Sequence, residues 1–101
     1  MRRLTEQERI RNQVMARRAR TAKQARRRAE FYTDVCEDVT YEEIRKRDGD
    51  SCYLCGEFLS VHDETFDHVV PLIKGGAHVA SNIRLAHREC NSKKGKGLLS
   101  A

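Results

Sequence analysis

Long apolar runs are missing from this sequence, and so is an apolar signal-peptide stretch at its start, which reads Met1-Arg2-Arg3-Leu4. A transmembrane helix needs about 20 mostly apolar residues, so a membrane span is excluded. Without a secretory signal we expect a soluble, cytoplasmic protein. Hydrophobic residues make up 39% of the 101 positions, which leaves little for a large core and room for one small domain with an appendage.

The chain has four cysteines. Domains of this size often need disulfides or a metal, because each ordered residue costs about 1.5 kcal/mol of conformational entropy. In a chain without a secretory signal, the pair Cys52-x-x-Cys55 favours metal over a disulfide bridge. Cys36 lies outside any ligand spacing and is expected to be a buried or idle thiol.

The net charge of +5 is unevenly distributed. Residues 1–28 carry 11 Lys and Arg against 2 Glu, residues 29–67 carry 12 acidic residues against 3 basic ones, and residues 68–101 carry 6 basic residues against 1 Glu. Positive charge at the two ends is typical of a surface that binds a polyanion.

Glycine and proline are absent from residues 5–31, which are rich in Ala, Arg, Gln and Glu. This composition predicts a long helix, with Thr5 and Glu8 as a capping box at its start. Its apolar residues are sparse, so we expect an exposed helix that is partly frayed until it meets a partner. It is either a solvated, charged helix or an arm that contacts DNA or RNA. We assign residues 1–34 to this basic helical arm and residues 35–101 to a globular domain.

The globular part predicts a small α+β fold. A capping box at Thr40 and Glu43 indicates a short helix over 41–48, ended by Gly49. Two short strands are expected over 66–70 and 82–86, antiparallel to each other and joined by a glycine-rich loop. A helix over about 87–94 should follow, ended by two glycines.

Four residues have the spacing of a metal site: Cys52, Cys55, His87 and Cys90. Each pair is separated by three positions, so each can converge on one tetrahedral ion, the second pair from one face of a helix. Four protein ligands close the coordination sphere, which indicates a structural zinc. The alternative is that His87 is a surface histidine and zinc has three ligands or none.

Asp67 and His68 form a second polar set between the two ligand pairs. Neighbouring residues of a strand point to opposite faces, so they share a site only if the strand ends or bulges there. In phosphodiester hydrolysis His68 could take a proton from water, and Asp67 could hold a divalent cation. A satisfied structural histidine is the other interpretation.

Several blocks in order resemble the HNH endonuclease family: Asp67-His68-Val69-Val70-Pro71, Gly75-Gly76-x-His78, Ser81-Asn82-Ile83 and Cys90-Asn91-x-x-Lys94-Gly95. The resemblance covers about residues 40–97 and includes the cysteine pair of the family's zinc-containing branch. The arrangement of these motifs is similar to that in the small HNH proteins of tailed phages. The resemblance implies a ββα-metal (His-Me finger) core, braced by the zinc and carrying one divalent cation such as Mg²⁺.

The resemblance also implies a role for each matching residue. His68 would be the general base, Asp67 and Asn91 the ligands of the catalytic cation, and Asn82 the residue that holds the active-site loop. Asn91 stands where the family usually has His, which makes this an H-N-N variant. A competing assignment makes His87 the third catalytic residue and leaves zinc one ligand short.

The implied activity is a metal-dependent DNA endonuclease of low sequence specificity, a monomer or weak dimer, located in the host cytoplasm if a phage encodes it. The rivals are a non-catalytic zinc module that binds nucleic acid and a phage packaging factor that contacts proteins such as terminase. His78 could contact the scissile phosphate or be a surface residue of its loop. The expected nucleic-acid-binding residues are Arg17, Arg18, Arg20, Lys23, Arg26, Arg27, Arg28, His78, Lys93, Lys94 and Lys96.

Overall fold

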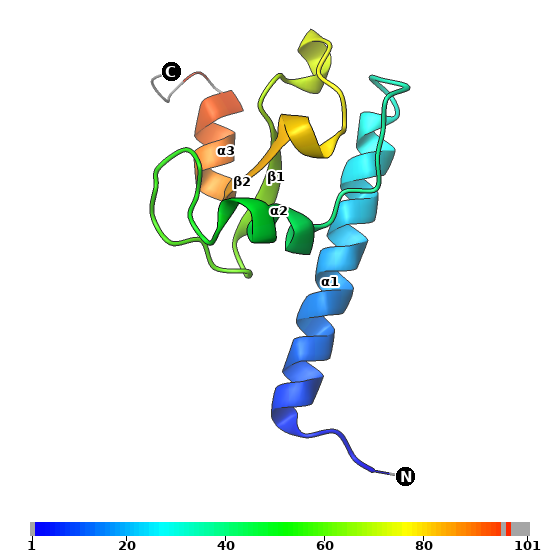
Figure 1. Ribbon diagram of the computed structural model, residues 1–101, viewed down its shortest axis with the longest axis vertical. Coiled ribbons are helices and arrows are strands. Elements are labelled where there is room, and N and C mark those ends of the chain that lie inside the picture. The colour runs from blue at the N-terminus through cyan, green and yellow to red at the C-terminus, as the bar shows by residue number, and fades with distance from the viewer. Residues whose placement is uncertain (1, 96, 98–101) are drawn as a thin grey trace.

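A computed structural model describes residues 2–95 and residue 97 of the chain, and it has the small α+β architecture that the sequence predicts (Figure 1). Among the described residues no helix has both the length and the apolarity of a membrane span. The elements, in chain order, are α1 (Glu6–Ala29), α2 (Tyr41–Asp48), β1 (Glu64–His68), η1 (Leu72–Lys74), η2 (Ala80–Asn82), β2 (Ile83–His87) and α3 (Arg88–Gly95).

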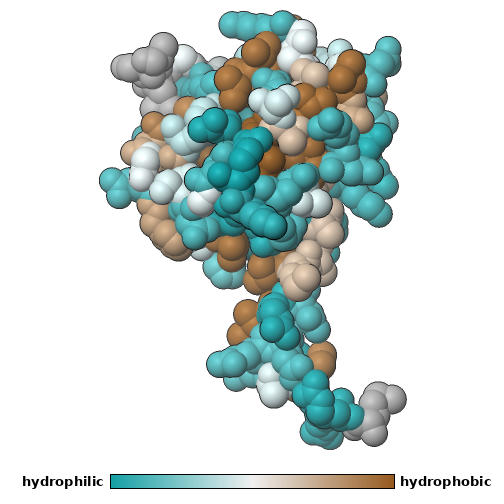
Figure 2. All heavy atoms as spheres, in the orientation of Figure 1, coloured by the Kyte–Doolittle hydropathy of each residue, from teal (hydrophilic) through white to brown (hydrophobic). Residues whose placement is uncertain are grey.

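Helix α1 begins at the predicted capping box. The Thr5 hydroxyl accepts a hydrogen bond from the Glu8 backbone N–H, and the Glu8 carboxylate accepts one from the Thr5 N–H. With 24 residues the helix is about 36 Å long, which exceeds what the small domain can cover. Its first turns therefore stand clear of the body, and the side in view in Figure 2 carries mostly hydrophilic residues there.

The second half of α1 packs against the domain, so the expectation of an exposed helix is correct for the first half of α1 and wrong for the second. Ala22 and Ala25 lie against the hydrophobic core, and Ala29 is fully buried. The Arg18 guanidinium pairs with the buried carboxylate of Glu64, at 2.7 Å between Nε and Oε2. A narrow strip of alanines and one buried ion pair therefore dock a helix that has few large apolar residues.

The core lies between α1, α2 and the hairpin. The Tyr41 ring at the start of α2 stacks on Phe66 of β1, with 4.1 Å between ring centroids and an interplanar angle of 15°. Helix α2 has the predicted bounds, with the Thr40–Glu43 capping box at its start and Gly49 at its end with φ of +86°. The other buried members of this core are Val39, Ile44, Leu59, Ile83 and Leu85.

Strands β1 and β2 pair antiparallel, as predicted, with Phe66 opposite Leu85 and His68 opposite Ile83. Each strand lies within two residues of its expected bounds. Helix α3 follows β2 directly and packs on both strands. The order strand, loop, strand, helix places the end of β1, the loop and one face of α3 beside each other.

Candidate active site and metal centre

The four residues with metal-ligand spacing come together at the base of α3. The ligand atoms of Cys52, Cys55, His87 and Cys90 all lie within 4.8 Å of one another. A tetrahedral zinc with Zn–S bonds of about 2.3 Å needs sulfur atoms roughly 4 Å apart. This Cys₃His group could hold a zinc ion. Such an ion would link the turn at Cys52 to the junction of β2 and α3.

The surroundings of the group suit a metal site. His87 Nδ1 lies 3.4 Å from Cys55 Sγ, and its Nε2 lies 2.9 Å from the carbonyl oxygen of Phe58. If Nε2 carries the proton and donates it to this carbonyl, Nδ1 keeps its lone pair and is free to bind metal. A backbone carbonyl is a usual hydrogen-bond partner for the non-ligating nitrogen of such a histidine. Burial alone would raise the pKa of Cys52, but hydrogen bonds from backbone N–H groups, His87 first, lower it to about 7. The Cys52 thiol is thus disposed to become a thiolate.

A separate cavity of about 490 Å³ opens beside the end of β1 and α3. Its walls come from four elements that are distant in sequence: the end of α1, the end of β1, the turn at η1 and one face of α3. The residues that line it are Arg28, Tyr32, Phe66, Asp67, His68, Pro71, Leu72, Ile73, Lys74, Asn91, Lys94 and Gly95. Three of the four predicted catalytic residues are therefore on its surface.

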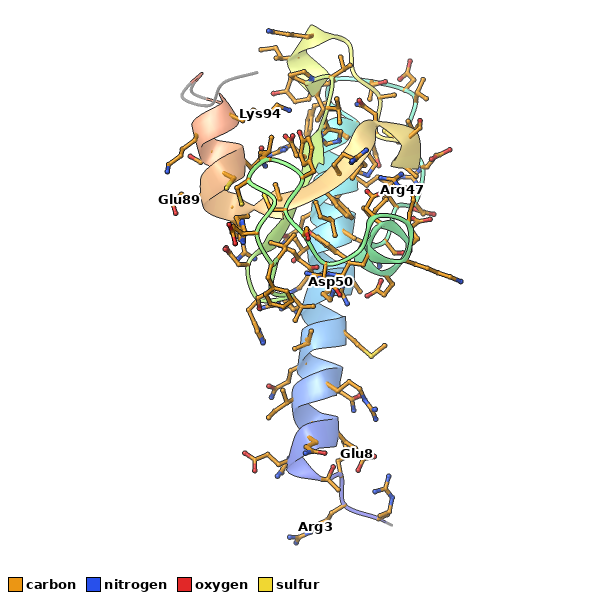
Figure 3. All side chains as sticks on the ribbon, turned by 60° about the vertical axis from the view of Figure 1, so that its left-hand side comes forward. Arg3, Glu8, Arg47, Asp50, Glu89 and Lys94 are labelled. Carbon is orange, nitrogen blue, oxygen red and sulfur yellow. The ribbon has the colours of Figure 1, made fainter. Side chains whose placement is uncertain are left out.

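Asp67 and His68 reach this cavity together because β1 ends at His68. Both side chains are buried, at 6% and 7% exposure, although neighbouring strand residues normally face opposite ways. Asp67 Oδ2 accepts hydrogen bonds from the Tyr53 hydroxyl and from Lys94, whose Nζ lies 2.7 Å away. Figure 3 shows Lys94 and Glu89 leaving opposite sides of α3.

His68 has one ring nitrogen engaged and one free among the described residues. Its Nε2 lies 3.0 Å from Nδ1 of His78, and Nδ1 makes no hydrogen bond there. Burial, followed by the nearby charges of His78 and Arg28, lowers the pKa of His68 to about 4. The imidazole is therefore neutral near pH 7, the state in which a ring nitrogen can accept a proton.

His78 is placed differently from either expectation. Its side chain is fully buried, so it neither contacts a phosphate nor lies on the loop surface. The loop that carries it is drawn inward: the His78 N–H donates to the Val35 carbonyl and the Glu37 N–H donates to the His78 carbonyl. The histidine therefore faces His68 from behind the cavity.

Asn82 holds the glycine-rich loop. Its side-chain Oδ1 accepts from the Val70 N–H at 2.9 Å, and its Nδ2 donates to the carbonyls of Val70 and Ala77. The loop passes close to the Val70 backbone at Gly76. Only glycine fits there, because a Cβ atom at this position would lie 1.8 Å from the Val70 carbonyl oxygen. Asn82 thus lies outside the cavity and acts on the loop that shapes it.

Asn91 lies one turn into α3 and faces the cavity. Its amide nitrogen is 3.4 Å from the Phe66 carbonyl, which turns Oδ1 away from that hydrogen bond. Asp67 Oδ1 likewise accepts no hydrogen bond within the described residues, since both partners of the carboxylate are on Oδ2. Two hard oxygen donors on one cavity fit a cation of the Mg²⁺ type. His87 belongs to the other group, so the geometry favours Asn91 over His87 for this position.

The basic residues expected to bind nucleic acid are dispersed. Arg17 donates to the Val61 carbonyl and Arg18 pairs with Glu64, so both are used inside the protein. Arg26 pairs with Asp38 and Lys93 pairs with Glu89. Of the expected residues on α1, Arg20, Lys23, Arg27 and Arg28 are exposed. Lys96 lies outside the described residues.

Several residues that line the cavity or contact its side chains were not predicted. Tyr53, which bonds Asp67, follows the first zinc ligand, and Tyr32 reaches the cavity from the turn after α1. Lys74 comes from the loop between the strands. No local pattern distinguishes these residues, since their position depends on the docking of α1 and on the Cys52 turn.

A comparison with known protein families finds a match for the part of the chain that carries this site. Residues 52–97 match the model of HNH endonucleases. The matched segment begins at the first cysteine of the Cys₃His group and includes Asp67, His68, Asn82 and Asn91. No curated protein matches the chain.

Proposed function

Because residues 52–97 form a domain of the HNH endonuclease family, we propose that the protein is a metal-dependent endonuclease that hydrolyses phosphodiester bonds of DNA. The observation that carries this proposal is the cavity beside α3. It combines a neutral histidine, two oxygen donors for a cation and three basic side chains within one space of about 490 Å³. A zinc module that only binds nucleic acid would need no such combination.

His68 is the proposed general base. Its Nδ1 makes no hydrogen bond among the described residues, and the side chain lines the cavity. A water molecule held against the phosphorus would give its proton to this nitrogen as the P–O bond forms. The lowered pKa of His68 keeps the imidazole unprotonated for this step across the neutral range.

Asp67 and Asn91 are the proposed ligands of a divalent cation, Mg²⁺ or a similar hard ion. When bound, such a cation stabilises the negative charge that develops on the leaving oxygen. The Tyr53 hydroxyl and the Lys94 ammonium fix one oxygen of the Asp67 carboxylate and leave the other free. The amide nitrogen of Asn91 makes a longer contact, 3.4 Å, with the Phe66 carbonyl, and its Oδ1 is not used in that contact.

DNA is the proposed substrate because basic side chains from three elements meet at the cavity: Arg28 of α1, Lys74 of η1 and Lys94 of α3. Such side chains contact phosphates, which carry no base information, so we propose low sequence specificity. This cavity contains one proposed general base and so provides one active site. A monomer would therefore nick one strand, and cutting both strands would take two events or two copies.

The test is conversion of supercoiled plasmid to nicked circles by the zinc-loaded protein with Mg²⁺, Mn²⁺ or Ni²⁺ added in turn. We expect nicking that requires the added cation and is lost in Asp67→Asn, which removes the one negative charge that the ligands offer to the cation but keeps the shape of the side chain. Intact plasmid with every cation would refute the proposal. Equal nicking by Asp67→Asn would refute the assignment of Asp67.

A further inference from the structure

The buried ring of His78 is the polar group that the proposed mechanism leaves unused. Its exposure is 0%, and its Nε2 is the one buried side-chain polar atom without a hydrogen-bond partner in the described part of the chain. Burying an unpartnered polar atom costs free energy, typically about 1–3 kcal/mol, and such atoms are few in native proteins. The other ring nitrogen, Nδ1, lies 3.0 Å from His68 Nε2.

We propose that His78 is a positioning residue that fixes His68 in the tautomer able to act as a base, an inference that rests on the proposed nuclease function. At 3.0 Å the two facing nitrogens share one proton. If His68 Nε2 carries it and donates to His78 Nδ1, the Nδ1 of His68 keeps a lone pair. If His78 carries it, neutral His68 must hold its proton on Nδ1 and has no lone pair left for water.

The surroundings of His78 favour the first arrangement. In that arrangement His78 carries its own proton on the unpartnered Nε2. The ring of Phe66 lies 6.3 Å from the His78 ring, tilted by 66°. The face of an aromatic ring is negative, so a tilted pair of this kind is compatible with an N–H on His78 and disfavours a second lone pair directed at that face. Nδ1 of His68 is then the basic nitrogen, on a side chain that lines the cavity.

The backbone holds His78 firmly enough for this role. Residues 35–37 form a segment, here called the strap, that hydrogen-bonds to the His78 backbone. The His78 N–H donates to the Val35 carbonyl at 3.0 Å, and the His78 carbonyl accepts from the Glu37 N–H at 2.7 Å. Glu37 extends the strap, since its carboxylate accepts from the Ala80 N–H at 2.9 Å. On the other side, Asn82 and the close approach at Gly76 fix the loop that leads into His78. The strap lies outside residues 52–97, the segment that matches the HNH family.

The first test reads the tautomer directly, without DNA or activity. In the zinc-loaded full chain labelled with ¹⁵N-histidine, long-range ¹H–¹⁵N correlation near neutral pH distinguishes protonated from unprotonated ring nitrogens. We expect His68 protonated on Nε2 with Nδ1 unprotonated, and His78 with Nδ1 unprotonated. A proton on Nδ1 of His68, or two tautomers in exchange, would overturn the proposal whatever the protein does to DNA.

The second test compares two replacements at position 78. His78→Asn can place its Oδ1 where Nδ1 was and still accept from His68, whereas His78→Leu fills similar space without an acceptor. We expect His78→Leu to lower kcat about 10–100-fold with KM changed less than about twofold, and His78→Asn to recover kcat to within about threefold of wild type. Equal losses in the two variants, at matched thermal stability and zinc content, would contradict a positioning role. If neither variant folds, the tautomer of the wild type decides.

Discussion

The Lys94 ammonium lies 2.7 Å from Asp67 Oδ2, so the carboxylate proposed to hold a divalent cation already has a positive neighbour. The pair is largely shielded from water, with 27% of the Lys94 side chain and 8% of the Asp67 side chain exposed. Burial lowers the pKa of Lys94, but the hydrogen bonds to Asp67 and Tyr53 and the charge of Asp67 together outweigh it, so the pKa of the amine is raised. Lys94 therefore stays charged at neutral pH and competes electrostatically with any cation at Asp67.

This relationship predicts that Lys94→Gln binds the cation more tightly. Two unit charges at 4 Å interact by roughly 4 kcal/mol at an effective dielectric of 20, and part of that repulsion is relieved when the flexible lysine moves. We expect the Kd for Mn²⁺, measured by calorimetry without DNA, to fall by about threefold or more. Lys93→Gln is the matched control, since Lys93 is exposed on the same helix and pairs with Glu89. An unchanged or weaker affinity in Lys94→Gln would separate Lys94 from the cation site.

Arg28 should contribute to DNA affinity from outside the family-matched segment. It is exposed at the end of α1 and lines the cavity. Removing one phosphate contact reduces the slope of log affinity against log salt by about 1 and weakens binding to all sequences alike. We expect this for Arg28→Ala in fluorescence anisotropy with duplex DNA and Ca²⁺ or no cation. Lys46→Ala, exposed on α2 and not part of the cavity, should leave the salt slope unchanged; equal slopes in all three proteins would remove Arg28 from the interface.

The Cys₃His group should bind one zinc per chain, and Cys90 should be required for it. In small zinc modules the metal contributes about 10–16 kcal/mol to folding. We expect Cys90→Ser to lose zinc in elemental analysis and to unfold at a lower temperature, and a high-affinity zinc chelator to do the same to the wild type. Cys36→Ser is the control, because Cys36 lies outside the group and its Sγ only approaches the Thr33 carbonyl. Full zinc content in Cys90→Ser would disprove the assignment.

Arg18 should hold α1 on the domain. Glu64 is 3% exposed and receives both Arg18 and Arg45, so removal of Arg18 leaves a buried carboxylate with half of its partners. Breaking a buried pair costs about 3–5 kcal/mol, and the remaining Arg45 places the expected loss for Arg18→Ala at the lower end. Arg20→Ala, at an exposed position, should change the free energy of unfolding by less than about 0.5 kcal/mol. Similar denaturant midpoints for the two variants would show that α1 is docked by its alanines alone.

The sequence predicted what local chemistry determines. Two capping boxes placed the starts of α1 and α2, since Thr5 and Thr40 each bond a backbone N–H three residues ahead. The two i, i+3 ligand pairs predicted the Cys₃His group, because a turn and a helix bring residues at that spacing to one side. The antiparallel hairpin followed from two short strands separated by a glycine-rich loop.

What the sequence did not predict depends on contacts between distant segments. Glu64 is 46 positions from Arg18, and no local pattern indicates that the two will meet. His78 is buried because residues 35–37 cross over its loop, an event encoded more than 40 positions away. The helical arm was expected to be exposed because its apolar residues are small and few, yet alanines are the side chains that allow α1 to approach the core closely.

The measurement that bears most directly on the nuclease proposal is plasmid nicking by His68→Ala beside His62→Ala. His62 is an exposed histidine whose ring has no role in the cavity, so the pair isolates the proposed base. With the divalent cation that supports the wild type, we expect His68→Ala to nick about 100-fold more slowly or not at all, with zinc content, thermal stability and DNA affinity retained. His62→Ala should nick at the wild-type rate. Wild-type nicking by purified His68→Ala would contradict the account.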